Sequence, residues 1–220
     1  MTSKQALPGR GSPGKGDKTR REILDVAADL ASARGLEGLT IGDLADVLGM
    51  SKSGLFAHFR SKEALQLAVV DLARAEFERR VLPAGDGAPP GVGRLLAWLL
   101  AWADHIDRGR FRGGCFFAAA SAEFDDRPGP VRDEIARLTR SWIDLLVREA
   151  EAARSQGQLR PRADPRQIVF EVHAFVQEAN WAKQLLEDHQ AFDRARRAIR
   201  SCLERQATAR GRRHLSRKDA

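Results

Sequence analysis

The sequence has few of the features that mark secreted or membrane proteins. Its only cysteines, Cys115 and Cys202, are too few and too far apart for a disulfide framework. No apolar run approaches the roughly 20 residues that a membrane-spanning helix needs. The basic residues Lys4, Arg10 and Lys15 are followed by no apolar stretch of the kind that a secretory signal contains. These absences predict a protein of the reducing cytoplasm without a membrane partner.

Catalytic and metal-binding patterns are also missing. We find no nucleophile paired with a base, no carboxylate pair in a recognisable context and no cofactor loop, which an enzyme should show. HxxxH and CxxC spacings are absent, so we expect no metal and no cofactor. Residues 9–15 resemble a phosphate-binding loop, but Gly16 stands where that loop needs Ser or Thr, and no strand precedes it. We therefore do not expect an enzyme; a small helical enzyme or a ligand carrier is the alternative to be tested.

Positive charge is concentrated at the two ends of the chain. The net charge is +7, of which residues 1–20 carry +4 and residues 194–220 carry +8, so the segment between them carries −5. Flexible basic ends attract polyanions without reading their sequence. We expect a disordered basic tail over residues 1–17 and a second one over residues 207–220, which adds salt-sensitive affinity for nucleic acid.

Helical periodicity runs through the rest of the chain, and alternating strand patterns are absent. The predicted fold class is all-α with about nine helices, arranged as a three-helix helix-turn-helix domain followed by a C-terminal helical bundle. In the first helix, apolar residues from Ile23 repeat as i, i+3, i+4, i+7 and i+8, and Gly35 follows as a C′ glycine. The Pro- and Gly-rich segment 83–93 marks the boundary between a first domain at 18–80 and a second at 90–206.

The most informative segment begins at Thr40. This residue has the character of an N-cap with Asp43 as its reciprocal partner, Gly49 ends the helix, and Ser51 caps a second short helix. The two short amphipathic helices are joined by a tight turn, and this turn holds the second helix out from the domain. Such a helix fits the DNA major groove with its N-terminal side chains at the base edges. This geometry has two interpretations, a DNA-binding unit or a plain packing unit of a helical protein, since short helical pairs are common in both.

The expected DNA contacts follow from the positions of the side chains on this unit. Lys52 can reach a guanine edge or a phosphate, while Ser51 and Ser53 are short hydroxyl donors. Gly54 lets the backbone approach the DNA, and Lys62 lies just past the helix, where phosphates are expected. The complete set of expected contacts is Thr40, Ser51, Lys52, Ser53, Gly54, Phe56, His58 and Lys62.

These residues resemble the DNA-binding domain of the tetracycline-repressor (TetR) family of regulators. The resemblance covers about residues 18–80, and its matching positions are Thr40, Leu44, Ala45, Gly49, Met50, Ser51, Lys52, Leu55, His58, Phe59, Lys62, Glu63 and Leu65. Phe56 stands where the family usually has Tyr, and Gly54 where it usually has Thr. Two hydroxyls that commonly contact the DNA backbone in such proteins are therefore lost.

The resemblance implies a ligand-responsive transcriptional regulator that binds a palindromic operator in double-stranded DNA as a homodimer. Family analogy favours a repressor over an activator. The eighth and ninth helices of two subunits would pair into a four-helix bundle. An effector in the second domain would shift the fourth helix and change the separation of the two reading helices, and the DNA would be released. The eighth predicted helix is apolar on more than one side, at Phe170, Val176 and Trp181, which is typical of a helix that also covers a partner.

Aromatic residues beyond the domain boundary have two interpretations. In a helical bundle they are most often core, but they also line apolar effector pockets. Trp98 and Trp102 lie four residues apart and so share a helix face. Cys115 is either a buried structural thiol or a redox sensor, and His173 is either a hydrogen-bonded core histidine or a ligand contact. The candidate contacts for a small apolar or aromatic effector are Trp98, Trp102, Cys115, Phe116, Phe124, Trp142, His173 and Trp181.

Overall fold

The computed structural model describes residues 15–109 and 111–216, and it confirms the all-α prediction. The elements are α1 (Lys15–Arg34), α2 (Ile41–Leu48), α3 (Lys52–Phe59), α4 (Lys62–Val81), the short 3-10 helix η1 (Leu82–Gly85), α5 (Val92–Asp107), α6 (Phe116–Phe124), α7 (Pro130–Ser155), α8 (Pro165–Leu186), α9 (Ala191–Gln206) and α10 (Ala209–Leu215). Residues 1–14 of the predicted N-terminal tail lie outside the described ranges. No helix within these ranges has the length and apolar character that crossing a membrane requires.

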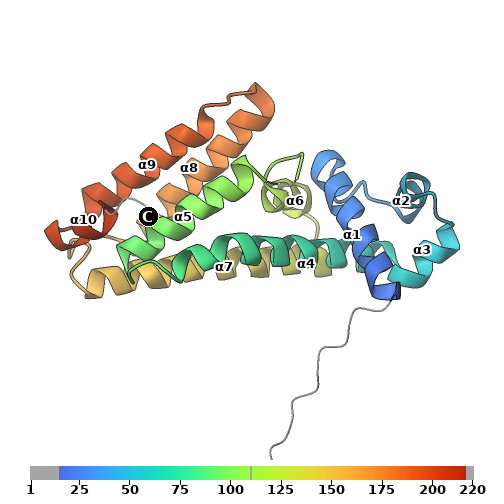
Figure 1. Cartoon of the computed structure of the whole chain (residues 1–220), viewed down its shortest axis with the longest axis horizontal. Coiled ribbons are helices and arrows are strands. Elements are labelled where there is room, and N and C mark those ends of the chain that lie inside the picture. Colours follow the sequence, from blue (N-terminus) through green and yellow to red (C-terminus); the bar gives the residue numbers. More distant parts are fainter. Residues whose placement is uncertain (1–14, 110, 217–220) are drawn as a thin grey trace, which may run out of the picture.

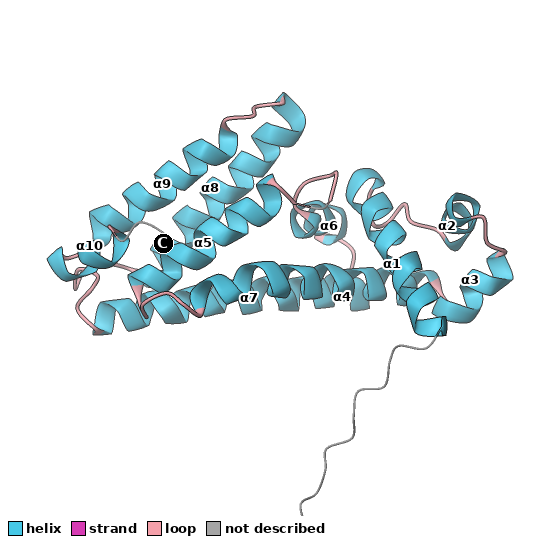
Figure 2. Ribbon diagram, in the orientation of Figure 1, coloured by secondary structure: helices cyan, strands magenta, loops and turns pink. Residues whose placement is uncertain are grey.

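The molecule is elongated, with α2 and α3 at one end and α10 at the other (Figure 1). Helices α4 and α7 run along its length and pack against each other. Helices α5, α8 and α9 form a second group beside them, and α6 lies between this group and α1 (Figure 2). The helix pair predicted to read DNA is therefore presented at one tip of the molecule, away from the larger group of helices.

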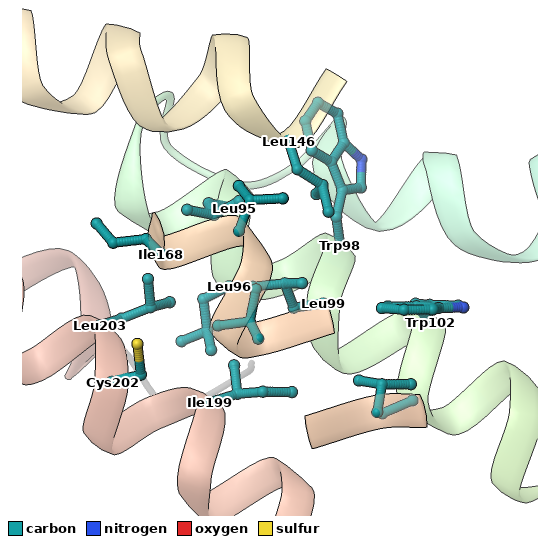
Figure 3. Packing of buried hydrophobic residues seen from close by; sticks show 14 of the residues in the cluster. Leu95, Leu96, Trp98, Leu99, Trp102, Leu146, Ile168, Ile199, Cys202 and Leu203 are labelled. Carbon is teal, nitrogen blue, oxygen red and sulfur yellow. The ribbon is translucent and has the colours of Figure 1, made fainter. Parts of the chain in front are cut away.

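Two hydrophobic cores hold the helices together. The first joins α1, α2, α3 and most of α4, and it also includes Phe116 and Phe124 of α6 and Val131 of α7. The second joins α5, α8, α9 and the C-terminal half of α7, with Leu99 and Ile199 among its fully buried side chains (Figure 3). The boundary between the cores therefore does not follow the Pro- and Gly-rich segment 83–93, because α6 lies beyond that segment and packs with the first core.

The prediction of a disordered tail over residues 207–220 is wrong for residues 207–216, which include a tenth helix where nine were expected. Thr208 caps α10 by accepting a hydrogen bond from the backbone N–H of Gly211 at 3.3 Å, and its hydroxyl donates to the Gly157 carbonyl at 2.7 Å. Leu215 is buried. Because α10 lies at the end of the molecule remote from α3 (Figure 1), its arginines do not extend the predicted DNA-reading surface. Residues 217–220 lie outside the described chain.

Candidate DNA-reading helix and internal cavity

The predicted helix pair is present as α2 and α3, and local capping explains where each helix begins and ends. Thr40 Oγ1 accepts a hydrogen bond from the Asp43 backbone N–H at 3.0 Å and donates to the Asp43 carboxylate at 2.7 Å. Gly49 ends α2 at φ +63°, in the left-handed region that favours glycine. Ser51 then caps α3 by accepting from the Gly54 N–H at 3.1 Å. These short-range contacts fix the turn that projects α3.

The two faces of α3 differ in burial. Leu55 and Phe59 are buried and attach the helix to the first core. Lys52 and Ser53 on the first turn are exposed, and the Phe56 ring on the next turn is 53% exposed. Phe is one of the side chains that contact the thymine methyl group. The outer face of α3 thus offers a cation, a hydroxyl and an apolar ring.

Lys62 is already engaged in an ion pair. Its Nζ donates to Glu37 Oε1 at 2.9 Å, and this hydrogen bond lowers the pKa of the Glu37 carboxyl. The Lys62 side chain stays 42% exposed, so a phosphate must compete with Glu37 for it. His58 is half-buried, with its ring 6.2 Å from that of Phe59. The remaining expected contacts lie along the tip formed by α2 and α3, and Lys62 also holds the start of α4 against the turn before α2.

A cavity of about 200 Å³ lies where the two cores meet. Its wall comes from α4, α5, α6, α7 and α8 and from the loop between α5 and α6. Five aromatic rings form a contiguous cluster on this wall, in which the His105 ring lies 5.8 Å from the Phe77 ring. Trp142 lies 5.0 Å from Phe77 and 5.7 Å from Trp102, and Trp102 lies 5.1 Å from His173, measured between ring centroids. The wall includes Phe77, Trp102, His105, Phe111, Cys115, Phe116, Phe117, Leu138, Trp142, Leu145, His173 and Gln177.

Most of the predicted effector contacts line this cavity. Those on its wall are Trp102, Cys115, Phe116, Trp142 and His173. Trp98 does not line it, because its indole N–H donates to the Leu82 carbonyl at 3.0 Å and its ring is buried in the second core, one turn of α5 away from Trp102 (Figure 3). Phe124 is buried in the first core, and Trp181 is 49% exposed on α8. Trp98 and Trp102 share one face of α5, but only Trp102 lines the cavity.

Several polar groups on the cavity wall are buried and uncharged. His105 Nδ1, Trp142 Nε1 and Gln177 Oε1 are buried, and the described residues offer them no hydrogen-bond partner. Burial lowers the pKa of His105 to about 4, and it also lowers the pKa of His173. Both imidazoles are thus neutral near pH 7. Burial raises the pKa of the Cys115 thiol, which favours the structural interpretation over a reactive thiolate.

Two helices connect the cavity with the DNA-reading tip. Helix α4 contributes Phe77 to the cavity wall and Leu65 to the core beneath α3. On α6, the Glu123 carboxylate accepts hydrogen bonds from the backbone N–H groups of Leu36 at 3.0 Å and Glu37 at 2.8 Å, in the turn between α1 and α2. Helices α4 and α6 thus each line the cavity and also contact the chain beside α2 and α3.

Sequence reasoning missed several groups on this wall. His105 follows Trp102 by three residues, and Gln177 follows His173 by four, so helical spacing from the predicted contacts was a usable signal. Phe77 was missed because its helix was assigned wholly to DNA binding. Within residues 15–109 and 111–216, no three His, Cys, Asp or Glu side chains gather where they could hold a metal ion.

Known protein families match both parts of the chain. The family model described as bacterial regulatory proteins, tetR family, matches residues 23–69, and the tetracyclin repressor-like C-terminal domain matches residues 91–199. The chain is 23% identical over 188 residues to the HTH-type transcriptional repressor NemR of Escherichia coli, covering 84% of this chain and 94% of NemR. It is 26% identical over 172 residues to the HTH-type transcriptional repressor KstR2 of Mycobacterium tuberculosis, covering 76% and 80%.

Solved structures extend the match to the fold. A TetR transcriptional regulator from Chloroflexus aurantiacus aligns with a TM-score of 0.80 at 25% identity, over 88% of this chain and 98% of that one. The structure of AibR in complex with isovaleryl coenzyme A and operator DNA aligns with a TM-score of 0.66 at 27% identity, over 80% and 95%. Both the helix pair at the tip and the helical domain around the cavity match one family, and the chain therefore belongs to the TetR family of transcriptional regulators.

Proposed function

We propose that this regulator is a repressor, which binds a palindromic operator as a homodimer and leaves it when a small, largely apolar effector fills the cavity. The observation that carries the proposal is the position of the cavity between the two cores, with α4 and α6 each connecting it to the DNA-reading tip. Two relatives, NemR and KstR2, are named transcriptional repressors, and AibR is seen with both a ligand and operator DNA. These relatives support both halves of the proposal.

DNA recognition is proposed to rest on the outer face of α3. Lys52 would contact a guanine edge or a phosphate, Ser53 a polar group, and Phe56 a thymine methyl group. Each good contact to a base discriminates by about 1–3 kcal/mol. One short helix with two or three such contacts is too weak to select a single site among millions of competitors, so two reading helices must act together.

The dimer surface is proposed to include the exposed side of α8. Of the large hydrophobic side chains that the described residues expose, four lie on this helix: Phe170, Trp181, Leu185 and Leu186. Phe170, Trp181 and Leu185 recur at i, i+11 and i+15, which places them on one stripe of the helix. Covering apolar surface is favourable by about 25 cal/mol per Å². Since α9 packs beside α8, the same pair in a second copy would complete a four-helix bundle.

Release is proposed to work through a change in the spacing of the two reading helices. In the family's dimeric arrangement, these helices enter successive major grooves roughly 34–36 Å apart. An effector that presses on Phe77 of α4 and Phe116 of α6 would move both helices relative to the second core. Because α4 continues into the core beneath α3, this movement would alter the spacing and lower the affinity for the operator.

The test uses mobility-shift and footprinting assays with the DNA upstream of the protein's own gene. We expect protection of two half-sites related by inverted symmetry, and Lys52→Ala should weaken binding at least about fivefold, as loss of a base contact does. Arg162→Ala is the control, because Arg162 is an exposed cation on the loop between α7 and α8. Protection of a single asymmetric half-site, or unchanged binding by folded Lys52→Ala, would contradict the proposal. A ligand carrier would show no sequence-specific shift at all.

A further inference from the structure

We infer that the effector is a neutral molecule of one or two rings that carries a hydroxyl group. This inference rests on the proposed function, because it takes the cavity as the effector site. Three observations carry it: the volume of the cavity, the pairing of the charges on its wall, and three buried polar atoms that the protein leaves without partners.

The volume and the wall limit the size and shape of the ligand. An apolar cavity of about 150 Å³ in another protein holds one benzene molecule. The cavity of about 200 Å³ therefore suits a substituted ring or a fused pair of rings. The Phe77 and Trp102 rings meet the Trp142 ring at 80° and 69°, so the wall presents both faces and edges of aromatic rings. Flat molecules pack well against such surfaces.

The unpartnered atoms require both a donor and an acceptor from the ligand. The Trp142 indole N–H can only donate, and the Gln177 carbonyl oxygen accepts. The Nδ1 atom of neutral His105 takes either role, depending on its tautomer. A wholly apolar ligand would bury these atoms unpaired or displace their water without replacing its hydrogen bonds, and either change lowers affinity. A hydroxyl group supplies an acceptor and a donor from one atom.

The charges on the wall favour a ligand without charge. Arg74 donates to Asp71 at 3.0 Å and to Glu78 at 2.6 Å, so each charged side chain on the described wall already has a counter-charge. A carboxylate could accept from the Trp142 N–H but would leave the Gln177 oxygen without a donor, and an ammonium could donate to that oxygen but would leave the Trp142 N–H without an acceptor. In both cases the ligand charge would be buried without a counter-charge, which is costly.

The experiment compares three bicyclic probes of equal ring size: naphthalene, 2-naphthol and 2-naphthoate. Binding to the full-length protein is measured by equilibrium dialysis below the solubility limit of each probe. We expect 2-naphthol to bind at least about fivefold more tightly than naphthalene, since one or two buried hydrogen bonds separate them. We expect 2-naphthoate to bind more weakly than 2-naphthol.

Variants identify the atoms responsible. Trp142→Phe keeps an aromatic ring and removes the N–H, and Gln177→Leu keeps the approximate size and removes the amide. Each should weaken 2-naphthol binding by about three- to tenfold and leave naphthalene within about twofold. Trp98→Phe is the matched control, because Trp98 does not line the cavity and its N–H is already paired with the Leu82 carbonyl. If Trp142→Phe does not fold, the binding of 2-naphthol and naphthalene to Gln177→Leu tests the inference.

The possible results separate this inference from the proposed function. Equal affinity for naphthalene and 2-naphthol, tighter binding of 2-naphthoate, or no binding of any probe overturns the ligand class. If 2-naphthol binds with the expected selectivity and does not release operator DNA, the ligand class stands and the proposed effector response fails. If naphthalene binds as tightly as 2-naphthol and releases the DNA, the effector response stands and the ligand class fails.

Discussion

Replacing Glu123 with alanine would remove the carboxylate that joins α6 to the turn between α1 and α2. This carboxylate accepts hydrogen bonds from two consecutive backbone N–H groups, those of Leu36 and Glu37. Leu36 is only 1% exposed, so its N–H would find little water after the substitution. Glu37 is half-buried, and water can reach its N–H more readily. The variant therefore leaves one donor unpaired and a second one solvated.

The expected loss follows from these two contacts. A hydrogen bond to a charged group contributes about 1.5–3 kcal/mol, and a buried donor without a partner costs a similar amount. With partial recovery by water at Glu37, Glu123→Ala should lower the free energy of unfolding by about 2–4 kcal/mol. Urea unfolding monitored by tryptophan fluorescence and by circular dichroism measures this loss. Glu123→Gln, which keeps one acceptor oxygen and loses the charge, should fall between the alanine variant and the original protein.

A surface carboxylate provides the control for this measurement. Glu134 on α7 pairs with Arg137 at 2.6 Å, three residues away on the same helix. Exposed pairs of this kind contribute about 0.2–1 kcal/mol, so Glu134→Ala should cost less than 1 kcal/mol. If Glu123→Ala costs no more than Glu134→Ala, the carboxylate does not hold the two parts together, and the route through α6 is refuted.

Three further predictions follow from burial. Trp181→Glu places a charge in the exposed stripe of α8 and should convert a dimer into a monomer in sedimentation at micromolar concentration; a persistent dimer would place the interface elsewhere. Burial holds the pKa of His105 near 4 against 6.5 for the free side chain, so the unfolded chain binds more protons between these values and stability falls as the pH falls. Between pH 7 and pH 5 this loss should be about 1–2 kcal/mol, and His105→Asn should remove it from urea unfolding curves. Leu215→Ala should cost about 2–3 kcal/mol in the same assay, whereas a residue in a disordered tail would cost nothing.

The DNA-reading tip was predictable because its signals are local. Thr40 and Ser51 each cap the helix that begins at the next residue, and Gly49 ends α2 by its own conformation. Leu55 and Phe59 follow the helical period that buries one side of α3. Capping and periodicity act over a few residues, so the neighbouring residues in the sequence are sufficient to identify them.

The cavity and the C-terminal helix depend on contacts between distant segments. Glu123 and Leu36 are separated by 87 positions, and no local pattern relates them. The i, i+4 spacing of Trp98 and Trp102 shows only that they share a helix face, whereas the hydrogen bond from the Trp98 indole N–H to the Leu82 carbonyl depends on where the chain places η1. The basic sequence of α10 suggested a solvated tail, although contacts with the loop after α7 stabilise a helix there. Tertiary packing overrode the local signal at each of these sites.

The position of the cavity also bears on how the protein unfolds. Each core is a separate set of buried side chains. Helices α4 and α7 contribute residues to both cores and so join them near the cavity. A bound ligand would contact Phe116 from the first core and Trp102 from the second at the same time. It would thereby make the unfolding of each core depend more strongly on the other. The calorimetric unfolding transition should therefore become sharper and move to higher temperature as the ligand concentration rises.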